Sequence, residues 1–135
     1  MSTLLTNNLT VGYTKPLIED IAMKVEAGKI TVLIGANGVG KSTILKSVAG
    51  LLKQIKGIVT IDDMNMSDIS SKEISKKMSL MMTGRSETEF TTCFDVVSVG
   101  RYQFTNIFGK ISDADKKVIE DAMRETGAYE YRDAD

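Results

Sequence analysis

The chain has 135 residues and a formal net charge of −1, with 42% hydrophobic and 26% charged residues. These values are ordinary for a globular domain with its own hydrophobic core, and they lack the basic excess of most nucleic-acid-binding proteins. A single cysteine excludes a disulfide within the chain, and the absence of histidine excludes histidine-based metal sites and general bases.

The first part of the chain reads as two strands, a helix and a further strand. In IEDIAMKVEAGK the residues Ile21, Met23 and Val25 share one side, which is typical of a half-buried strand. Residues 30–34, ITVLI, are continuously apolar and predict a strand buried on both faces. GIVTID predicts a short strand. Helical spacing after Lys41 is shown by Ile44, Leu45, Val48, Leu51 and Leu52.

The second part reads as mostly helical. SDISSKEISKK predicts a short helix, residues 78–82 a strand, TGRSETEFTT a loop and CFDVVSVGRY a helix. The clearest helix is SDADKKVIEDAMRETG, in which Ser112 and Asp115 match a capping box and Gly127 is a stop. Its predicted apolar stripe comprises Ala114, Val118, Ile119, Ala122 and Met123.

The most informative motif is GANGVGKST, residues 35–43. A buried strand before it and an amphipathic helix after it are the context of a phosphate-binding loop. Gly35, Gly38 and Gly40 allow successive backbone N–H groups to point inward, and the following helix adds the positive end of its dipole. The alternative is a glycine-rich turn that binds nothing.

Side chains in and near this loop suggest how a nucleotide would be held. Lys41 would reach the β- and γ-phosphates, Ser42 would ligate Mg²⁺ and Thr43 would donate to the α-phosphate. Tyr13, upstream of the loop, is either a packing residue or a ring that stacks on adenine.

Residues 9–62, from LTVGYTKP to GIVTID, resemble the start of an ABC-transporter ATPase subunit. In that family an aromatic residue like Tyr13 precedes the loop and stacks on adenine, and Asn37 is typical of the loop itself. The resemblance implies an α/β fold: the N-terminal part of a P-loop NTPase (ABC ATPase) core, with a small antiparallel β subdomain and the beginning of a helical subdomain.

Residues 96–123, VVSVGRYQFTNIFGKISDADKKVIEDAM, resemble the subfamily that energises import of iron-siderophore, haem or cobalamin. This implies binding of ATP and Mg²⁺, with Lys41 stabilising the transition state of hydrolysis in a complete subunit. The implied partners are membrane-spanning permease subunits, a second ATP-binding subunit in head-to-tail arrangement and, indirectly, a periplasmic or surface substrate-binding protein. The implied location is the cytoplasmic side of the plasma membrane. Tyr102, Phe104 and Phe108 are either core residues or lie near the surface that meets the membrane subunit.

Several parts of the family pattern are missing from the sequence. It contains no Ser-Gly-Gly signature, no late apolar run ending in Asp-Glu and no switch histidine. We therefore expect residues 1–135 to be a partial nucleotide-binding domain that is inactive alone and leaves the strand before the loop without neighbours. IVTIDD could be read as an apolar strand that ends in two catalytic acids, but the family resemblance places Asp62 and Asp63 in a turn after an early antiparallel strand. The position of the family's metal-side glutamine falls on Thr83, which is either a residue near metal-bound water or an ordinary loop residue.

Two other interpretations remain open at this point. One is a small phosphate-loop kinase, for which Arg85 and Arg101 offer thin support as a lid. The other is a stand-alone nucleotide-binding module that never hydrolyses its ligand.

Overall fold

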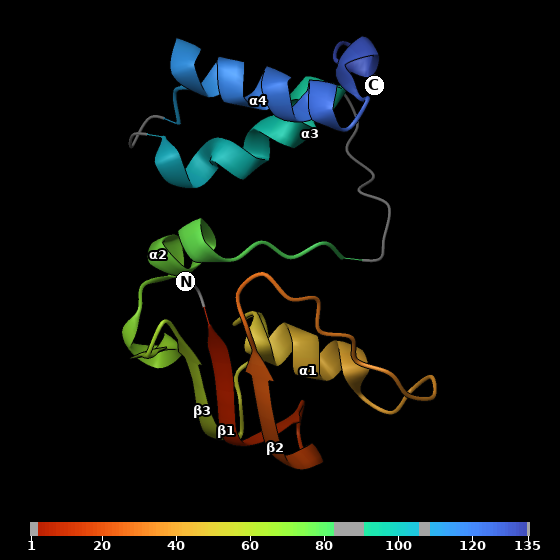
Figure 1. Cartoon of the computed structure of the whole chain (residues 1–135), viewed down its shortest axis with the longest axis vertical. Coiled ribbons are helices and arrows are strands. Elements are labelled where there is room, and N and C mark those ends of the chain that lie inside the picture. Colours follow the sequence, from red (N-terminus) through yellow and green to blue (C-terminus); the bar gives the residue numbers. More distant parts are fainter. Residues whose placement is uncertain (1–2, 83–90, 106–108, 135) are drawn as a thin grey trace. The chain divides into compact units, whose positions relative to one another are not determined.

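The sheet at the start of the chain is antiparallel throughout. The computed structural model describes residues 3–82, 91–105 and 109–134, which form two compact units, residues 1–80 and 81–135. The strands are β1 (Leu4–Gly12), β2 (Pro16–Val25), β3 (Lys56–Ile61) and β4 (Met64–Asn65), in the order β2-β1-β3-β4 (Figure 1). The expected small antiparallel subdomain is therefore confirmed.

The core of the first unit lies between this sheet and helix α1 (Lys41–Val48). The helix presents Ile44 and Val48 to the sheet, as its spacing predicted, whereas Leu45 is half exposed. Leu51 and Leu52, which were expected in the same helical run, lie beyond the end of α1. The unit continues with a short 3₁₀ turn, η1 (Met66–Asp68), and with α2 (Ser71–Lys77), which confirms the helix expected there. The buried core consists of Leu9, Val11, Ile44, Val48, Val59, Ile61 and Met66.

Asp62 and Asp63 form the turn between β3 and β4, as expected. Both have positive φ, 51° and 63°, and they join the paired residues Ile61 and Met64, which is the geometry of a two-residue hairpin turn. The Asp62 carboxylate accepts a bond from the Thr3 amide at 3.2 Å and pairs with Lys77 Nζ at 2.5 Å. The bond from Lys77 holds the pKa of Asp62 below its ordinary range. The Asp62 side chain therefore links the residue before β1 to the last residue of α2.

The strand predicted at residues 30–34 is wrong for this structure. The segment is in no strand, and Ile30, Val32 and Ile34 are 93%, 69% and 88% exposed. A strand buried on both faces needs neighbouring strands and covering helices, and the described residues supply none of these to it. Residues 78–82 are likewise not a strand, and Met81 is almost fully exposed.

The second unit is helical: α3 (Cys93–Ser98), η2 (Val99–Phe104), α4 (Asp113–Glu125) and η3 (Tyr129–Tyr131). The predicted capping box of Ser112 and Asp115 is present, and Gly127, with φ 71°, follows the end of α4. No helix in the described part of the chain is long and apolar enough to cross a membrane.

The apolar stripe predicted for α4 is only partly right. Ile119 and Met123 are buried, but Ala114, Val118 and Ala122 are exposed. The buried residues of α4 instead begin with Asp115, whose carboxylate accepts hydrogen bonds from the Ser112 amide and hydroxyl at the N-cap and from the Arg101 guanidinium. Residues 115, 119 and 123 follow one another at intervals of about one helical turn, so they lie on the same face of α4, the face that is buried.

The aromatic residues of the second unit are not core residues where they are described. Tyr102 is 68% exposed, and Phe104 is 48% exposed and stacks on the Arg101 guanidinium, 4.1 Å from the ring centroid. Phe108 lies outside the described residues.

Candidate phosphate-binding site

The candidate site begins where residues 35–40 turn into α1. Gly38 has φ 80°, and Gly40 is the N-cap of α1 with φ 102° and ψ 11°. The Ile44 amide donates to the Gly40 carbonyl at 3.0 Å and so starts the helix. Only glycine adopts such φ values without strain, which explains why positions 38 and 40 are glycines.

The loop rests on the first residues of β2. A Cβ atom at Gly40 would lie 2.7 Å from Ile18 Cδ1 and 3.1 Å from Leu17 Cδ2. These two side chains therefore back the loop at the point where the helix begins. Leu17 and Ile18 were not anticipated as part of the site, because nothing in their spacing distinguishes a side chain that supports a loop from one that fills the core.

Tyr13 lies just before β2, in the connection from β1. Gly12 pairs with Pro16, so residues 13–15 form the tip of the β1–β2 hairpin. A Cβ atom at Gly12 would lie 2.0 Å from the Lys15 carbonyl oxygen, so the tip closes only with glycine at that position. Tyr13 is 66% exposed at this tip, and its ring is free of the core. The packing interpretation of Tyr13 is therefore not supported, and its stacking role stays a prediction.

Lys41 lies across the loop. Its Nζ donates to the carbonyl oxygens of Gly35 at 2.7 Å and of Ala36 at 2.6 Å. It forms no ion pair with any residue in the described ranges, and the first turn of α1 contains no acidic residue. The ammonium and the positive end of the helix dipole are thus both left without a countercharge, an arrangement suited to an anion.

The remaining residues of the motif lie where the loop meets the helix. Asn37 is exposed in the turn, and Ser42 is exposed in the first turn of α1. Thr43 is buried on the face of α1 that packs on the sheet. Thr83 lies outside the described residues. Neither the contact of Ser42 with Mg²⁺ nor that of Thr43 with a phosphate is tested by this geometry, and both stay predictions.

A resident metal site is not formed by the described residues. No group of three or more Cys, Asp or Glu side chains in residues 3–82, 91–105 and 109–134 is placed to hold a metal ion. A magnesium ion at this loop would take most of its octahedral set of oxygen ligands from water and a bound phosphate.

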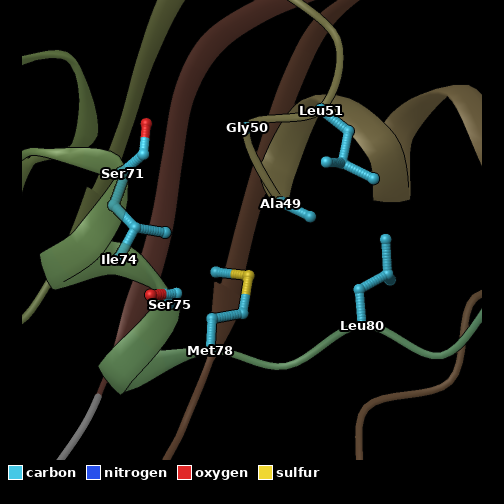
Figure 2. Close-up of a pocket in the computed structure, with 8 residues that line it drawn as sticks. All are labelled: Ala49, Gly50, Leu51, Ser71, Ile74, Ser75, Met78 and Leu80. Atoms are coloured by element: carbon cyan, nitrogen blue, oxygen red, sulfur yellow. The ribbon is translucent and has the colours of Figure 1, made fainter. Parts of the chain in front are cut away.

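A separate cavity of about 260 Å³ lies at the other end of α1 (Figure 2). Ile74 and Met78 face Ala49 and Leu51 across it, and only Ser71 and Ser75 contribute hydroxyl groups. Its lining is completed by Gly50 and Leu80. This cavity is apolar and carries no charged group, so it is unsuited to phosphates.

Comparison with curated proteins gives related sequences along nearly the whole chain. A family model described as ABC transporter matches residues 18–134. The chain is 39% identical over 126 residues to an uncharacterized ABC transporter ATP-binding protein of Methanocaldococcus jannaschii, covering 93% of this chain and 43% of that protein. It is 36% identical over 132 residues to the iron(3+)-hydroxamate import ATP-binding protein of Bacillus subtilis (97% and 49%), and 32% identical over 131 residues to the petrobactin import ATP-binding protein of Bacillus anthracis (96% and 48%).

Solved structures show the same fold. A nucleotide-free ATP-binding cassette from an ABC transporter aligns with a TM-score of 0.80 at 18% identity, covering 99% of this chain and 57% of that one. The ATP-binding subunit of an ABC transporter aligns with a TM-score of 0.77 at 23% identity, covering 96% and 52%. The chain spans about half the length of the curated relatives it matches.

Proposed function

Because the chain belongs to the ABC transporter family of ATP-binding proteins, we propose that residues 35–43 bind the phosphates of ATP. The observation that carries the proposal is the position of Lys41, whose ammonium is held by two loop carbonyls beside an unneutralised helix N-terminus. A lysine placed in this way neutralises phosphate charge without a carboxylate competing for it.

Each residue of the site has a defined part in the proposal. The backbone amides between Gly35 and Gly40 donate to phosphate oxygens, with Asn37 in the turn. Lys41 contacts the β- and γ-phosphates and carries the catalytic charge in a complete subunit.

Ser42 ligates Mg²⁺, and Thr43 contacts the α-phosphate. Tyr13 stacks on adenine from the hairpin tip, where its ring is exposed. Thr83 is proposed beside metal-bound water in place of a glutamine.

For the biological role we propose nucleotide-powered import of a ferric chelate. The support is that two of the relatives are named as import ATP-binding proteins, for iron(3+)-hydroxamate and petrobactin. In this role residues 1–135 form part of a nucleotide-binding domain on the cytoplasmic side of the membrane. Its proposed partners are permease subunits, a second ATP-binding subunit and, indirectly, a substrate-binding protein. Binding of ATP would do work through its tighter association with the closed state of the assembly than with the open one.

The first test is MgATP binding by isothermal titration calorimetry with the wild type, Lys41→Ala and Lys46→Ala. Lys46 lies in the last turn of the same helix and serves as the matched control. We expect wild type and Lys46→Ala to bind alike, and Lys41→Ala to bind at least about tenfold more weakly, since a hydrogen bond to a charged group contributes about 1.5–3 kcal/mol. Equal binding by all folded proteins would refute the proposal.

Hydrolysis of MgATP by the same proteins separates binding from turnover. We expect no turnover above the Lys41→Ala control, because the sequence contains no late Asp-Glu pair for activating water. Turnover that disappears in Lys41→Ala would show that the chain supplies its own catalytic acid.

A further inference from the structure

The side chains of strand β2 do not alternate regularly near its start. Met23 and Ile21 both pack against the core, at the two-residue interval of a regular strand. The next residue that packs there, Ile18, follows after an interval of three. Regular alternation would place Glu19 on the core side and turn Ile18 outward, because side chains of a strand change face at every residue. An extra residue in β2 is therefore needed for Ile18 to face inward.

The extra residue belongs to a β-bulge at Asp20. Leu9 of β1 pairs with Ile21. Two residues further along β1, Val11 pairs with Ile18, so this stretch of β2 is one residue longer than the stretch of β1 that it faces. Asp20 has φ 55°, in the left-handed region that few residues other than glycine adopt. Bulges bend a strand and redirect its side chains, and they are frequent next to active sites.

The neighbouring strands are irregular at the same level of the sheet. Strand β1 has an extra residue of its own at Asn8, where φ is 46°. In β3, a Cβ atom at Gly57 would lie 2.3 Å from the Asn8 carbonyl oxygen, so β3 can follow β1 here only with glycine at that position. Asn8, Asp20 and Gly57 line one hollow in the surface of the sheet. The bulge in β2 is thus one of three irregularities that lie side by side.

The bulge matters for the candidate site because Ile18 reaches the start of α1. A Cβ atom at Gly40 would lie 2.7 Å from Ile18 Cδ1 and 3.3 Å from Ile18 Cγ1. The Gly40 carbonyl accepts the Ile44 amide at 3.0 Å, in the bond with which the helix begins. Ile18 also packs against the core. Its side chain therefore connects the core to the residue at which the phosphate loop becomes a helix.

We propose that the bulge at Asp20 directs Ile18 onto Gly40, and that Ile18 is a positioning residue which acts on the nucleotide only through the phosphate loop. The effect on MgATP rests on the proposed function. Without this contact the loop is in its phosphate-binding conformation for a smaller fraction of the time, and the affinity falls by that fraction. Substitutions that act on a site without touching its ligand typically change coupling by about 2- to 30-fold. We expect a loss of about fivefold for Ile18→Ala.

The first experiment compares alanine at two isoleucines of the same strand. Ile18 and Ile21 both pack against the core, but only Ile18 is among the nearest neighbours of Gly40. The 135-residue chain and its variants are titrated with MgATP by calorimetry, and urea unfolding measures their stability. Both variants should lose stability, but only Ile18→Ala should lose affinity for MgATP. Equal affinities in the two variants would overturn the positioning role.

A second experiment tests the contact between Ile18 and Gly40 directly. Ile18→Val removes Cδ1, the atom that a methyl group at position 40 would meet first, and retains Cγ1. The double variant Gly40→Ala with Ile18→Val should therefore bind MgATP more tightly than Gly40→Ala alone. We expect a gain of at least about twofold, the lower limit of the coupling between contacting residues. Losses that simply add in the double variant would overturn the contact.

A third pair of variants tests the bulge itself. Asp20→Gly and Asp20→Ala both remove the carboxylate, but only alanine opposes a positive φ. Asp20→Gly should bind MgATP like the wild type, and Asp20→Ala should bind it about twofold more weakly or worse. Equal affinities of these two folded variants would show that the bulge does not direct Ile18.

A measurement without nucleotide separates loop positioning from the proposed function. Hydrogen exchange of the Ile44 amide, which is bonded at the start of α1, is compared with that of the Ala49 amide, which is bonded at its end. Ile18→Ala should accelerate exchange at Ile44 more than at Ala49, and Ile21→Ala should not. Absence of this difference would overturn the positioning role. If the difference is present but no folded protein binds MgATP, the proposed function fails while the positioning of the loop stands.

Discussion

Replacing each of two loop glycines by alanine gives a matched pair of perturbations at the candidate site. Gly38 and Gly40 both have positive φ, so alanine at either position costs about 1–2 kcal/mol of backbone strain. At Gly38 the new methyl group meets nothing within 4 Å. At Gly40 it would lie 2.7 Å from Ile18 Cδ1, and moving that flexible side-chain end adds about 1 kcal/mol, the low end of the cost of overpacking.

Most of this strain should appear in the affinity for nucleotide. The loop is exposed and can relax in the free protein, so the cost falls on MgATP binding, which requires the strained conformation. A free energy of 1.36 kcal/mol corresponds to a factor of ten in affinity. We therefore expect Gly38→Ala to bind MgATP about tenfold more weakly than the wild type, and Gly40→Ala to bind it about fivefold more weakly than Gly38→Ala. Calorimetric titration gives the affinities, and urea unfolding shows whether the fold is intact.

Two results would refute this reasoning. Equal affinity losses in the two folded variants would mean that the contact between Gly40 and Ile18 does not support the loop. Wild-type affinity in Gly38→Ala would mean that the positive φ of this residue is not needed when phosphates bind.

The remaining predictions concern the hairpin tip, the α4 cap and a sheet glycine. Tyr13→Ala should weaken MgATP binding by about 1 kcal/mol and leave the binding of inorganic triphosphate unchanged. Tyr131→Ala, a control at another exposed tyrosine, should change neither, and equal losses of MgATP affinity in the two variants would contradict stacking. Bonds from Ser112 and then Arg101 lower the pKa of Asp115 below its ordinary 3.8, so this carboxylate stabilises the fold above pH 3.8 and the contribution is lost as the pH falls further. Ser112→Ala removes the N-cap bond to the Asp115 amide and should cost about 1 kcal/mol in urea unfolding at pH 7. The cost should be smaller in acid, where the bond from Ser112 Oγ to the ionised carboxylate is already lost, and a cost that is unchanged in acid would argue against this. Gly57→Ala should lower the free energy of unfolding by about 3 kcal/mol or more, because φ is 87° and the new Cβ would lie 2.3 Å from the carbonyl oxygen of Asn8. A melting temperature like that of the wild type would show that this close approach does not constrain position 57 to glycine.

Features specified by neighbouring residues were predictable from the sequence. The loop, α1 and the capping box of Ser112 and Asp115 depend on glycine φ angles, side-chain caps and residue spacing over a few positions. The turn at Asp62 and Asp63 was instead expected from the family resemblance. The physical causes lie within one or two turns of chain, so no knowledge of distant residues was needed. The family resemblance seen in residues 9–62 is confirmed by the family match.

Features that depend on distant partners were decided only by the tertiary structure. The composition of residues 30–34 favours a buried strand, but strand pairing and burial are supplied by other segments, and the described residues do not supply them. The hydrogen bonds from Arg101 hold Asp115 in the buried position and so fix which face of α4 is buried. Ile18, far from the motif in sequence, is placed behind Gly40 by the β1–β2 pairing. The sequence by itself predicted the phosphate-binding loop and identified the family, because the residues of the motif are neighbours in the chain. The tertiary structure decided what supports the loop and which apolar segment is left uncovered, because those contacts join residues that lie far apart in the sequence.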